Sequence, residues 1–417
     1  MRTSSLKITI ASSLVGLIVL PITGCVLGPK ALSYSRTEYN RAVQLTANEQ
    51  MLLNIVRMRY RDTPEFVAVS SISTQFTFDA GATVGTDLKS SLPDIFHADG
   101  SVAASERPTI TYMPLQDEQF AHRLLSPMSM ETLLLLTRTG WSMERVLRLM
   151  VQNINGLDNA TSAGGPTPQL RPDFESFKKV AGYFRTLQNR NQVEIAYQKS
   201  KTPKTLSGPI PVQQIAGTDL VLAAEKGFRF DVNEEGTQVI LTSPDQFLVL
   251  RVAPNIDKTS EGDVIFEELN IDPPGAKRNY YPLRLANEGQ LFEGRETVKN
   301  QLWISTRSLL ETLYYLSQGI DIPAGHYADG IVTKTLNSDG SVFDWNELTG
   351  DLLRIHHSKQ RPVQSSVAVQ YREYWFFIDD SDLQSKSTFS LLMELYNLEI
   401  RGGGAVSAPV LTLGVGQ

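Results

Sequence analysis

Three aspartates, Asp379, Asp380 and Asp382, come closest in this sequence to a catalytic or metal-binding pattern. They directly follow residues 374–378, whose aromatic and aliphatic side chains predict a strand. Carboxylates at the end of a strand can bind a metal ion or act as general acids, as in hydrolases. The same residues are also typical of a strand-to-helix turn, where carboxylates accept hydrogen bonds from free backbone amides. We expect the turn, and a hydrolase site built on these aspartates stays open as an alternative.

Other patterns that could support chemistry also have structural explanations. Ser176 and Lys179 have the spacing found in penicillin-recognising enzymes, but they fall in an amphipathic helical pattern and are expected on its exposed face. Residues 337–341 resemble a sparse calcium loop, but Asp339-Gly340 between alternating segments favours a hairpin turn. The sequence contains five histidines and one cysteine, and it lacks the short motifs of zinc peptidases, α/β-hydrolases and nucleotide-binding loops. It therefore predicts a protein that is not an enzyme, with no catalytic residue, metal site or cofactor.

The first half of the chain is expected to be mainly helical, with one extended hairpin, over residues 36–159. Thr46 and Glu49 have the spacing of a capping box, and they predict a helix that Pro64 ends. Further helical patterns follow between residues 116 and 155.

Within this region, residues 66–78 alternate with a period of two and predict a long strand. Ile72, Phe76 and Phe78 share one face of that strand, and residues 109–113 predict its shorter partner after a polar, glycine-containing loop. No charge or proline lies between residues 66 and 78 to protect the strand edge, so we expect Ile72, Phe76 and Phe78 to contact another chain or another copy. The alternative is that the rest of the protein covers this edge. Insertion of such hairpins from several subunits into a membrane would require a more apolar face than one containing Ser70 and Thr74.

A linker at residues 160–172 precedes the second half, residues 173–417, which reads as helices and blocks of strands. Strands are predicted at residues 193–197, 228–232, 237–242, 247–252, 330–336, 341–345, 352–356, 366–371, 374–378 and 409–413. The gaps between them suit antiparallel pairing. Residues 305–316 and 387–398 agree at eight of twelve positions and predict two long helices, which could belong to two related modules at about residues 220–325 and 326–417. The predicted class is α+β: a helical N-terminal part with an extended hairpin, then mainly antiparallel sheet with two long helices.

The first residues have the layout of a secretory signal peptide. Arg2 and Lys7 precede an almost wholly apolar run over residues 8–22, and small residues follow. The run is shorter than the roughly 20 apolar residues that a transmembrane helix needs, so we interpret residues 1–24 as a removable leader.

The segment Ile22-Thr23-Gly24-Cys25 resembles the lipobox of bacterial lipoproteins. The resemblance implies cleavage before Cys25, lipid on its thiol, and a short tether over residues 25–35. Val26 stands where enteric-type lipoproteins retained in the inner membrane have aspartate, so the resemblance also implies an outer-membrane location. An ordinary secretory leader with a cysteine at its border is the alternative.

The amino-acid composition limits the disulfides that this chain can form and the partners that it is expected to bind. Cys25 is the only cysteine, so the chain can form no intramolecular disulfide. Removal of the leader takes away two positive charges and leaves 37 basic against 45 acidic residues, so a nucleic acid is not an expected partner. We expect a non-catalytic envelope lipoprotein with a structural, assembly or accessory role, which binds envelope proteins or itself. A solute-binding lipoprotein and an envelope hydrolase using Asp379, Asp380 and Asp382 are the alternatives.

Overall fold

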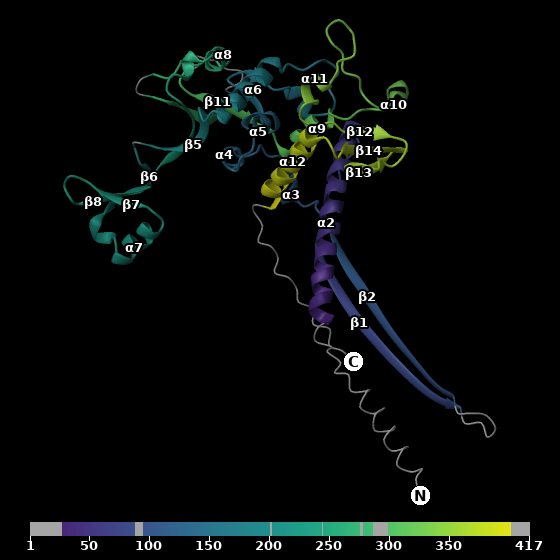
Figure 1. Ribbon diagram of the computed structural model, residues 1–417. Helices are drawn as coiled ribbons and strands as arrows, with labels where there is room; N and C mark the ends of the chain where they lie inside the picture. Colours follow the sequence, from purple (N-terminus) through teal and green to yellow (C-terminus); the bar gives the residue numbers. More distant parts are fainter. Residues whose placement is uncertain are drawn as a thin grey trace. The chain divides into compact units, whose positions relative to one another are not determined.

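The computed structural model describes residues 27–87, 95–200, 202–243, 245–275, 278–286 and 299–401. The chain divides into two compact units, residues 1–50 and 51–417, and helix α2 (Leu27–Arg59) runs from the first into the second. The second unit combines helices with separate, mostly antiparallel sheets, which confirms the α+β prediction (Figure 1). The predicted leader and Cys25 lie outside the described residues. None of the helices in these ranges combines the length and the apolar character that a membrane-spanning segment requires.

The helices after α2 are α3 (Glu118–Leu125), α4 (Met130–Arg138), α5 (Met143–Met150), α6 (Glu175–Asn189), α7 (Gly217–Glu225), α8 (Ser260–Glu268), α9 (Leu309–Ser317), α10 (Ala324–Ala328), α11 (Asn346–Thr349) and α12 (Leu383–Arg401). The strands are β1 (Val67–Asp87), β2 (Ile95–Pro114), β3 (Val151–Ile154), β4 (Leu157–Asp158), β5 (Val193–Lys199), β6 (Lys204–Pro211), β7 (Arg229–Val232), β8 (Gln238–Ser243), β9 (Gln246–Val252), β10 (Tyr280–Leu285), β11 (Leu302–Thr306), β12 (His356–Ser358), β13 (Ser365–Tyr371) and β14 (Tyr374–Asp379).

Helix α2 begins earlier than the sequence pattern predicts. Residues 27–35, expected to be a tether, are helical. Thr46 lies inside the helix, where its hydroxyl donates to the carbonyl of Ala42 at 2.9 Å, so it is not the N-cap that the capping-box spacing suggested. In the second unit, Leu52 and Ile55 at the end of α2 are fully buried in the core.

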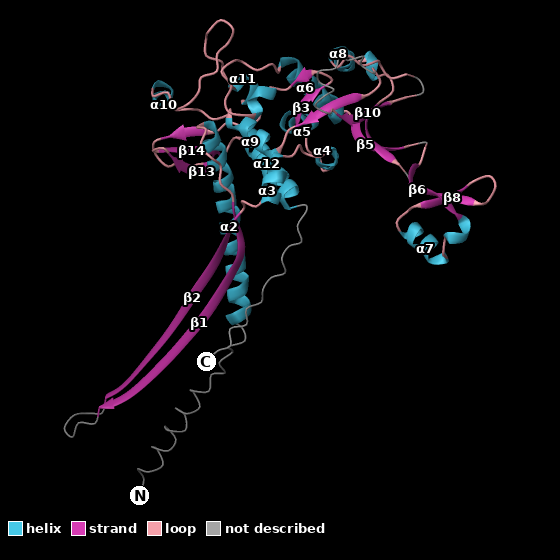
Figure 2. Ribbon diagram, turned by 180° about the vertical axis from the view of Figure 1, so that it is seen from behind, coloured by secondary structure: helices cyan, strands magenta, loops and turns pink. Residues whose placement is uncertain are grey.

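Strands β1 and β2 form an antiparallel hairpin that pairs with no other described strand (Figure 2). The pairing runs from Val67 opposite Pro114 to Asp87 opposite Ile95, with a bulge at Ser70. The prediction of strands at 66–78 and 109–113 was too short, because residues 79–87 and 95–108, most of which were expected to form a loop, continue both strands.

The largest sheet of the described residues belongs to the second unit and has six strands, in the order β4-β3-β11-β10-β9-β5. Its pairs are antiparallel except β10 and β11, which are parallel. Helix α6 packs near this sheet with Phe177, Val180 and Phe184 buried, as the aromatic stripe in its sequence predicts. Arg307, directly after β11, is fully buried and donates to the backbone carbonyls of Arg148 and Val151 at 2.8 and 3.0 Å.

The remaining described strands form two three-stranded antiparallel sheets, in the orders β12-β14-β13 and β6-β8-β7. The strands predicted at 193–197, 228–232, 237–242, 247–252, 366–371 and 374–378 are present as β5, β7, β8, β9, β13 and β14. The predictions at 330–336 and 341–345 were wrong, since those segments contain turns and only isolated bridges, which join Leu336 to Leu170 and to Val342. Residues 352–356 become a strand only at their end, in β12, and residues 409–413 lie outside the described part of the chain.

The two similar Leu-rich segments, residues 305–316 and 387–398, occupy different places: the first spans the end of β11 and most of α9, whereas the second lies wholly inside α12, which begins at Leu383. Helix α12 is long, with 19 residues, whereas α9 has only nine. The strand before α9 belongs to the six-stranded sheet, and the strand before α12 is the middle strand of a three-stranded sheet.

Candidate functional site

The aspartate cluster forms the turn between β14 and α12. Asp379 accepts hydrogen bonds from the backbone amide of Ser381 at 2.8 Å and from its hydroxyl at 2.5 Å. Asp382 accepts from the backbone amide and hydroxyl of Ser385 at 3.0 and 2.6 Å, at the start of α12. Asp380 is ion-paired with Lys386 at 2.6 Å. Each carboxylate therefore has a local partner, and the three do not converge on a common point.

The electrostatics of these carboxylates also suit a turn. Hydrogen bonds from Ser381 lower the pKa of Asp379. Burial opposes ionisation of Asp382, but hydrogen bonds from Ser385 and Gln384 bring its pKa below the ordinary value. A general acid at neutral pH needs a raised carboxyl pKa, so the shifts run against that role. Among the residues that the structure describes, no group of histidine, cysteine and acidic side chains is arranged to hold a metal ion.

A histidine–aspartate pair lies close to this turn. The Nδ1 atom of His356 is 3.0 Å from a carboxylate oxygen of Asp321, and Nδ1 of His357 is 3.0 Å from the backbone carbonyl oxygen of Asp321. The hydrogen bond with Asp321 raises the pKa of His356, and the same contact lowers the pKa of Asp321. Sequence reasoning missed this pair, because its members are 35 positions apart. The contacts connect β12 to the segment after α9.

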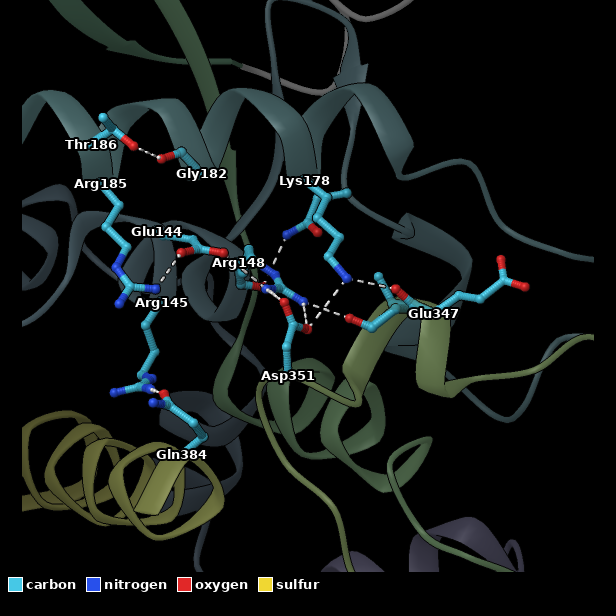
Figure 3. Close-up of polar contacts among 12 residues, drawn as sticks. Glu144, Arg145, Arg148, Lys178, Gly182, Arg185, Thr186, Glu347, Asp351 and Gln384 are labelled. Carbon is cyan, nitrogen blue, oxygen red and sulfur yellow. Dashed lines mark hydrogen bonds and ion pairs between the residues drawn. The ribbon is translucent and has the colours of Figure 1, made fainter. Parts of the chain in front are cut away.

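A polar cavity of about 310 Å³ lies between α5, α6 and the start of α12, and Figure 3 shows its charged residues. The side chain of Arg148 is 1% exposed and forms a two-pronged ion pair with Asp351, with distances of 2.8 and 2.9 Å. Arg148 also contacts Glu144 at 3.2 Å, and Arg185 contacts the other oxygen of Glu144 at 3.3 Å. Burial opposes the charge of Arg148, but its hydrogen bonds to Asp351 hold its pKa above the ordinary value.

Arg145 is the arginine of this cavity for which the described residues supply no acidic partner. It donates to the side-chain oxygen of Gln384, and its Nε atom is buried without a hydrogen-bond acceptor. Burial, together with the positive charge of Arg185, lowers its pKa. Because Glu144 and Asp351 line the same cavity, three guanidinium groups face two carboxylates. Lys178 on α6 also pairs with Asp351, at 3.4 Å, so the basic groups here outnumber the two carboxylates, and the ion pairs connect α5, α6 and the segment after α11.

Lys178 and Lys179 lie beside the cavity, on α6. Lys178 donates to the backbone carbonyl of Glu347 at 2.7 Å. Lys179, from the pattern shared with penicillin-recognising enzymes, pairs with Glu268 at 3.3 Å and is 48% exposed. The expected exposed helix face is confirmed at Lys179.

The β1–β2 hairpin is the remaining candidate, as a binding surface. At its near end Ile110, Tyr112 and Met113 are 41%, 63% and 51% exposed, and Ile72 is half-buried. The side chains of Phe76 and Phe78 lie outside the described part of the structure, whereas their backbone pairs opposite Glu106 and Ala104. Within the described residues each strand pairs only with the other, so the two outer edges of the hairpin have no neighbouring strand there.

Comparison of the chain with protein-family models, with curated proteins and with solved structures gave no match.

Proposed function

We propose that this chain is a non-catalytic lipoprotein of the bacterial cell envelope, anchored by lipid on Cys25, which assembles with envelope proteins or with copies of itself through the β1–β2 hairpin. The observation that carries the proposal is the length of this hairpin without a third strand. About 20 residues of each strand pair with each other and with no other described strand. An unpaired edge of this length normally pairs with another chain or is protected by charge.

The residue types along β1 also suggest that another chain covers the outer edge of this strand. From Val67 to Thr77 there is no charged residue and no proline, and the first charge is Asp79. Apolar side chains at the near end of β2, Ile110 and Tyr112, are exposed in the single chain. Burial of such side chains by a partner contributes about 25 cal/mol for each Å² of apolar surface removed from water.

The lipid anchor is tested by Cys25→Ser. The variant should incorporate no fatty-acid analogue in growing cells, because the chain has no other thiol to accept the lipid. It should also leave the membrane fraction or accumulate as a precursor. Equal labelling of the variant and the unchanged chain would contradict the lipoprotein proposal.

The hairpin contact is tested by a photo-crosslinking amino acid at Ile110, with the same residue at Val363 as the matched control. Val363 is 98% exposed in the loop between β12 and β13 and lies far from the hairpin in sequence. In native membranes, illumination should give a discrete adduct from position 110 and none from position 363. Equal adducts from both positions, or none from position 110, would remove the support for assembly through the hairpin.

A further inference from the structure

We propose that the far part of the hairpin lies in a lipid bilayer, with one face against the acyl chains and with hairpins from several copies of this chain side by side. The inference rests on the proposed assembly through β1 and β2, and it names the partners as lipid and further copies.

The register of the hairpin divides its residues into two faces of unlike chemistry. Residues directly opposite each other in an antiparallel pair lie on the same face, and neighbours along a strand alternate. From Ile72 opposite Ile110 to the far end, even-numbered residues pair with even-numbered ones, and odd with odd. The even-numbered positions 72–86 and 96–110 form one face, and the odd-numbered positions form the other.

Charge is distributed unequally between these faces. Glu106 is the one charged residue at the even-numbered positions 72–86 and 96–110. The odd-numbered positions carry Asp79, Asp87, Asp99 and Arg107, and most of their other residues are serine, threonine or glycine. Alternation of this kind over both strands is typical of a sheet with lipid on one side and water on the other.

The even-numbered face between residues 76–86 and 96–106, which is uncharged except for Glu106 at its end, has the dimensions of a bilayer core. Residues 76–86 and 96–106 pair throughout, which gives 11 residues in each strand. A tilted strand needs about 9 to 11 residues to cross the hydrocarbon region. Phe76 and Phe78 are placed at one end of this band and Phe96 at the other, as aromatic residues are at the two membrane interfaces. Glu106, opposite Phe76, stands at the boundary, where a charge costs little.

The backbone explains why further copies are needed. A bilayer core offers no hydrogen-bond partner, so an edge of unpaired amides and carbonyls is not stable there. Residues 76–86 and 96–106 contain no proline, so every amide of both edges can donate to a neighbouring strand. Hairpins from neighbouring copies would provide hydrogen-bond partners for the outer backbone amides and carbonyls of both β1 and β2. The odd-numbered polar face would then border a water-filled passage.

The test places single cysteines along β1 of the full chain, purified from membranes and reconstituted in vesicles of phosphatidylethanolamine and phosphatidylglycerol. Ala80→Cys, Ala82→Cys and Val84→Cys sample the even-numbered face, and Gly81→Cys, Thr83→Cys and Gly85→Cys sample the other. Each thiol carries an environment-sensitive fluorophore. Cys25 is the only native cysteine, so a lipidated chain without a substitution should take up no label.

We expect quenching by a lipid-attached quencher at positions 80, 82 and 84, and quenching by aqueous iodide at positions 81, 83 and 85. Even-numbered positions that are shielded from iodide yet insensitive to the lipid-attached quencher would overturn the bilayer inference and leave the proposed assembly in place. Equal exposure of all six positions to iodide, with no adduct from position 110 in native membranes, would overturn both. A thermal melt of each variant confirms that the body is folded.

Discussion

At the scale of single residues, the aspartates that most suggested catalysis stabilise the turn between β14 and α12. Asp382 accepts hydrogen bonds from two backbone amides at the start of α12, those of Gln384 and Ser385 at 3.1 and 3.0 Å. Carboxylates at a helix N-terminus are stabilised by the free amides there. The sequence was sufficient to favour this interpretation, because a strand followed at once by Asp, Ser and a helical pattern already specifies the turn.

The turn interpretation predicts a small, graded loss of stability. Asp382→Ala should lower the free energy of unfolding by about 1 kcal/mol, as expected for a lost N-cap. Asp380→Ala is the matched control, because Asp380 only forms an exposed ion pair with Lys386 and should cost less than about 1 kcal/mol. Denaturant melts measure both values. A variant that melts like the unchanged chain but loses the cellular phenotype would show that a functional site exists in the turn.

The networks of buried charged side chains could not be predicted from the sequence. Arg148 meets Asp351 across 203 positions, and Arg307 reaches the carbonyl of Arg148 across 159. Nothing in the local pattern around an arginine shows that it will be buried, because arginine is usually exposed. Burial of Arg307 lowers its pKa to about 10, and its guanidinium carbon lies over the ring of Tyr315, 4.2 Å from the ring centroid.

At the scale of elements, prediction succeeded where one pattern dominated. Phe177, Val180 and Phe184 recur at helical spacing in α6, and all three are buried. It failed along the hairpin, because residues 79–104 contain many small and polar residues and resemble a loop when each strand is read alone. The alternation becomes clear only when the register places Ala80 opposite Val102 and Val84 opposite Ala98.

Ser70 and Thr74 made the strand face look too polar for insertion into a membrane. Both residues belong to the near end of the hairpin, since Ser70 is at the bulge and both precede the band at 76–86.

A shortened hairpin should leave the body intact. Gln75 and Arg107 are paired, so deletion of residues 76–106 and closure of these two with an Asn-Gly turn preserves the register of the near end. The removed strands pair with no other described strand, so we expect an unchanged melting temperature of the body. A large drop in the melting temperature would show that residues 76–106 belong to the protein's own core.

At the scale of the whole molecule, the sequence predicted the α+β class but not how the strands divide among sheets. The hairpin and the six-stranded sheet differ in a way that bears on function. Among the strands that the structure describes, most of those in the six-stranded sheet have neighbours on both sides, whereas β1 and β2 have one neighbour each. A chain held at a membrane by lipid on Cys25 would have its partners restricted to the same membrane, which raises their effective concentration for pairing along these edges.

The most direct test of assembly through the hairpin is the mass of the particle that contains this protein, after gentle extraction from native membranes. The unchanged chain should be found in a particle heavier than a single copy with its detergent. The variant lacking residues 76–106 should run as a single copy while it keeps the melting temperature of the body. A particle of the same mass for both chains would contradict the account, and so would a single copy for the unchanged chain.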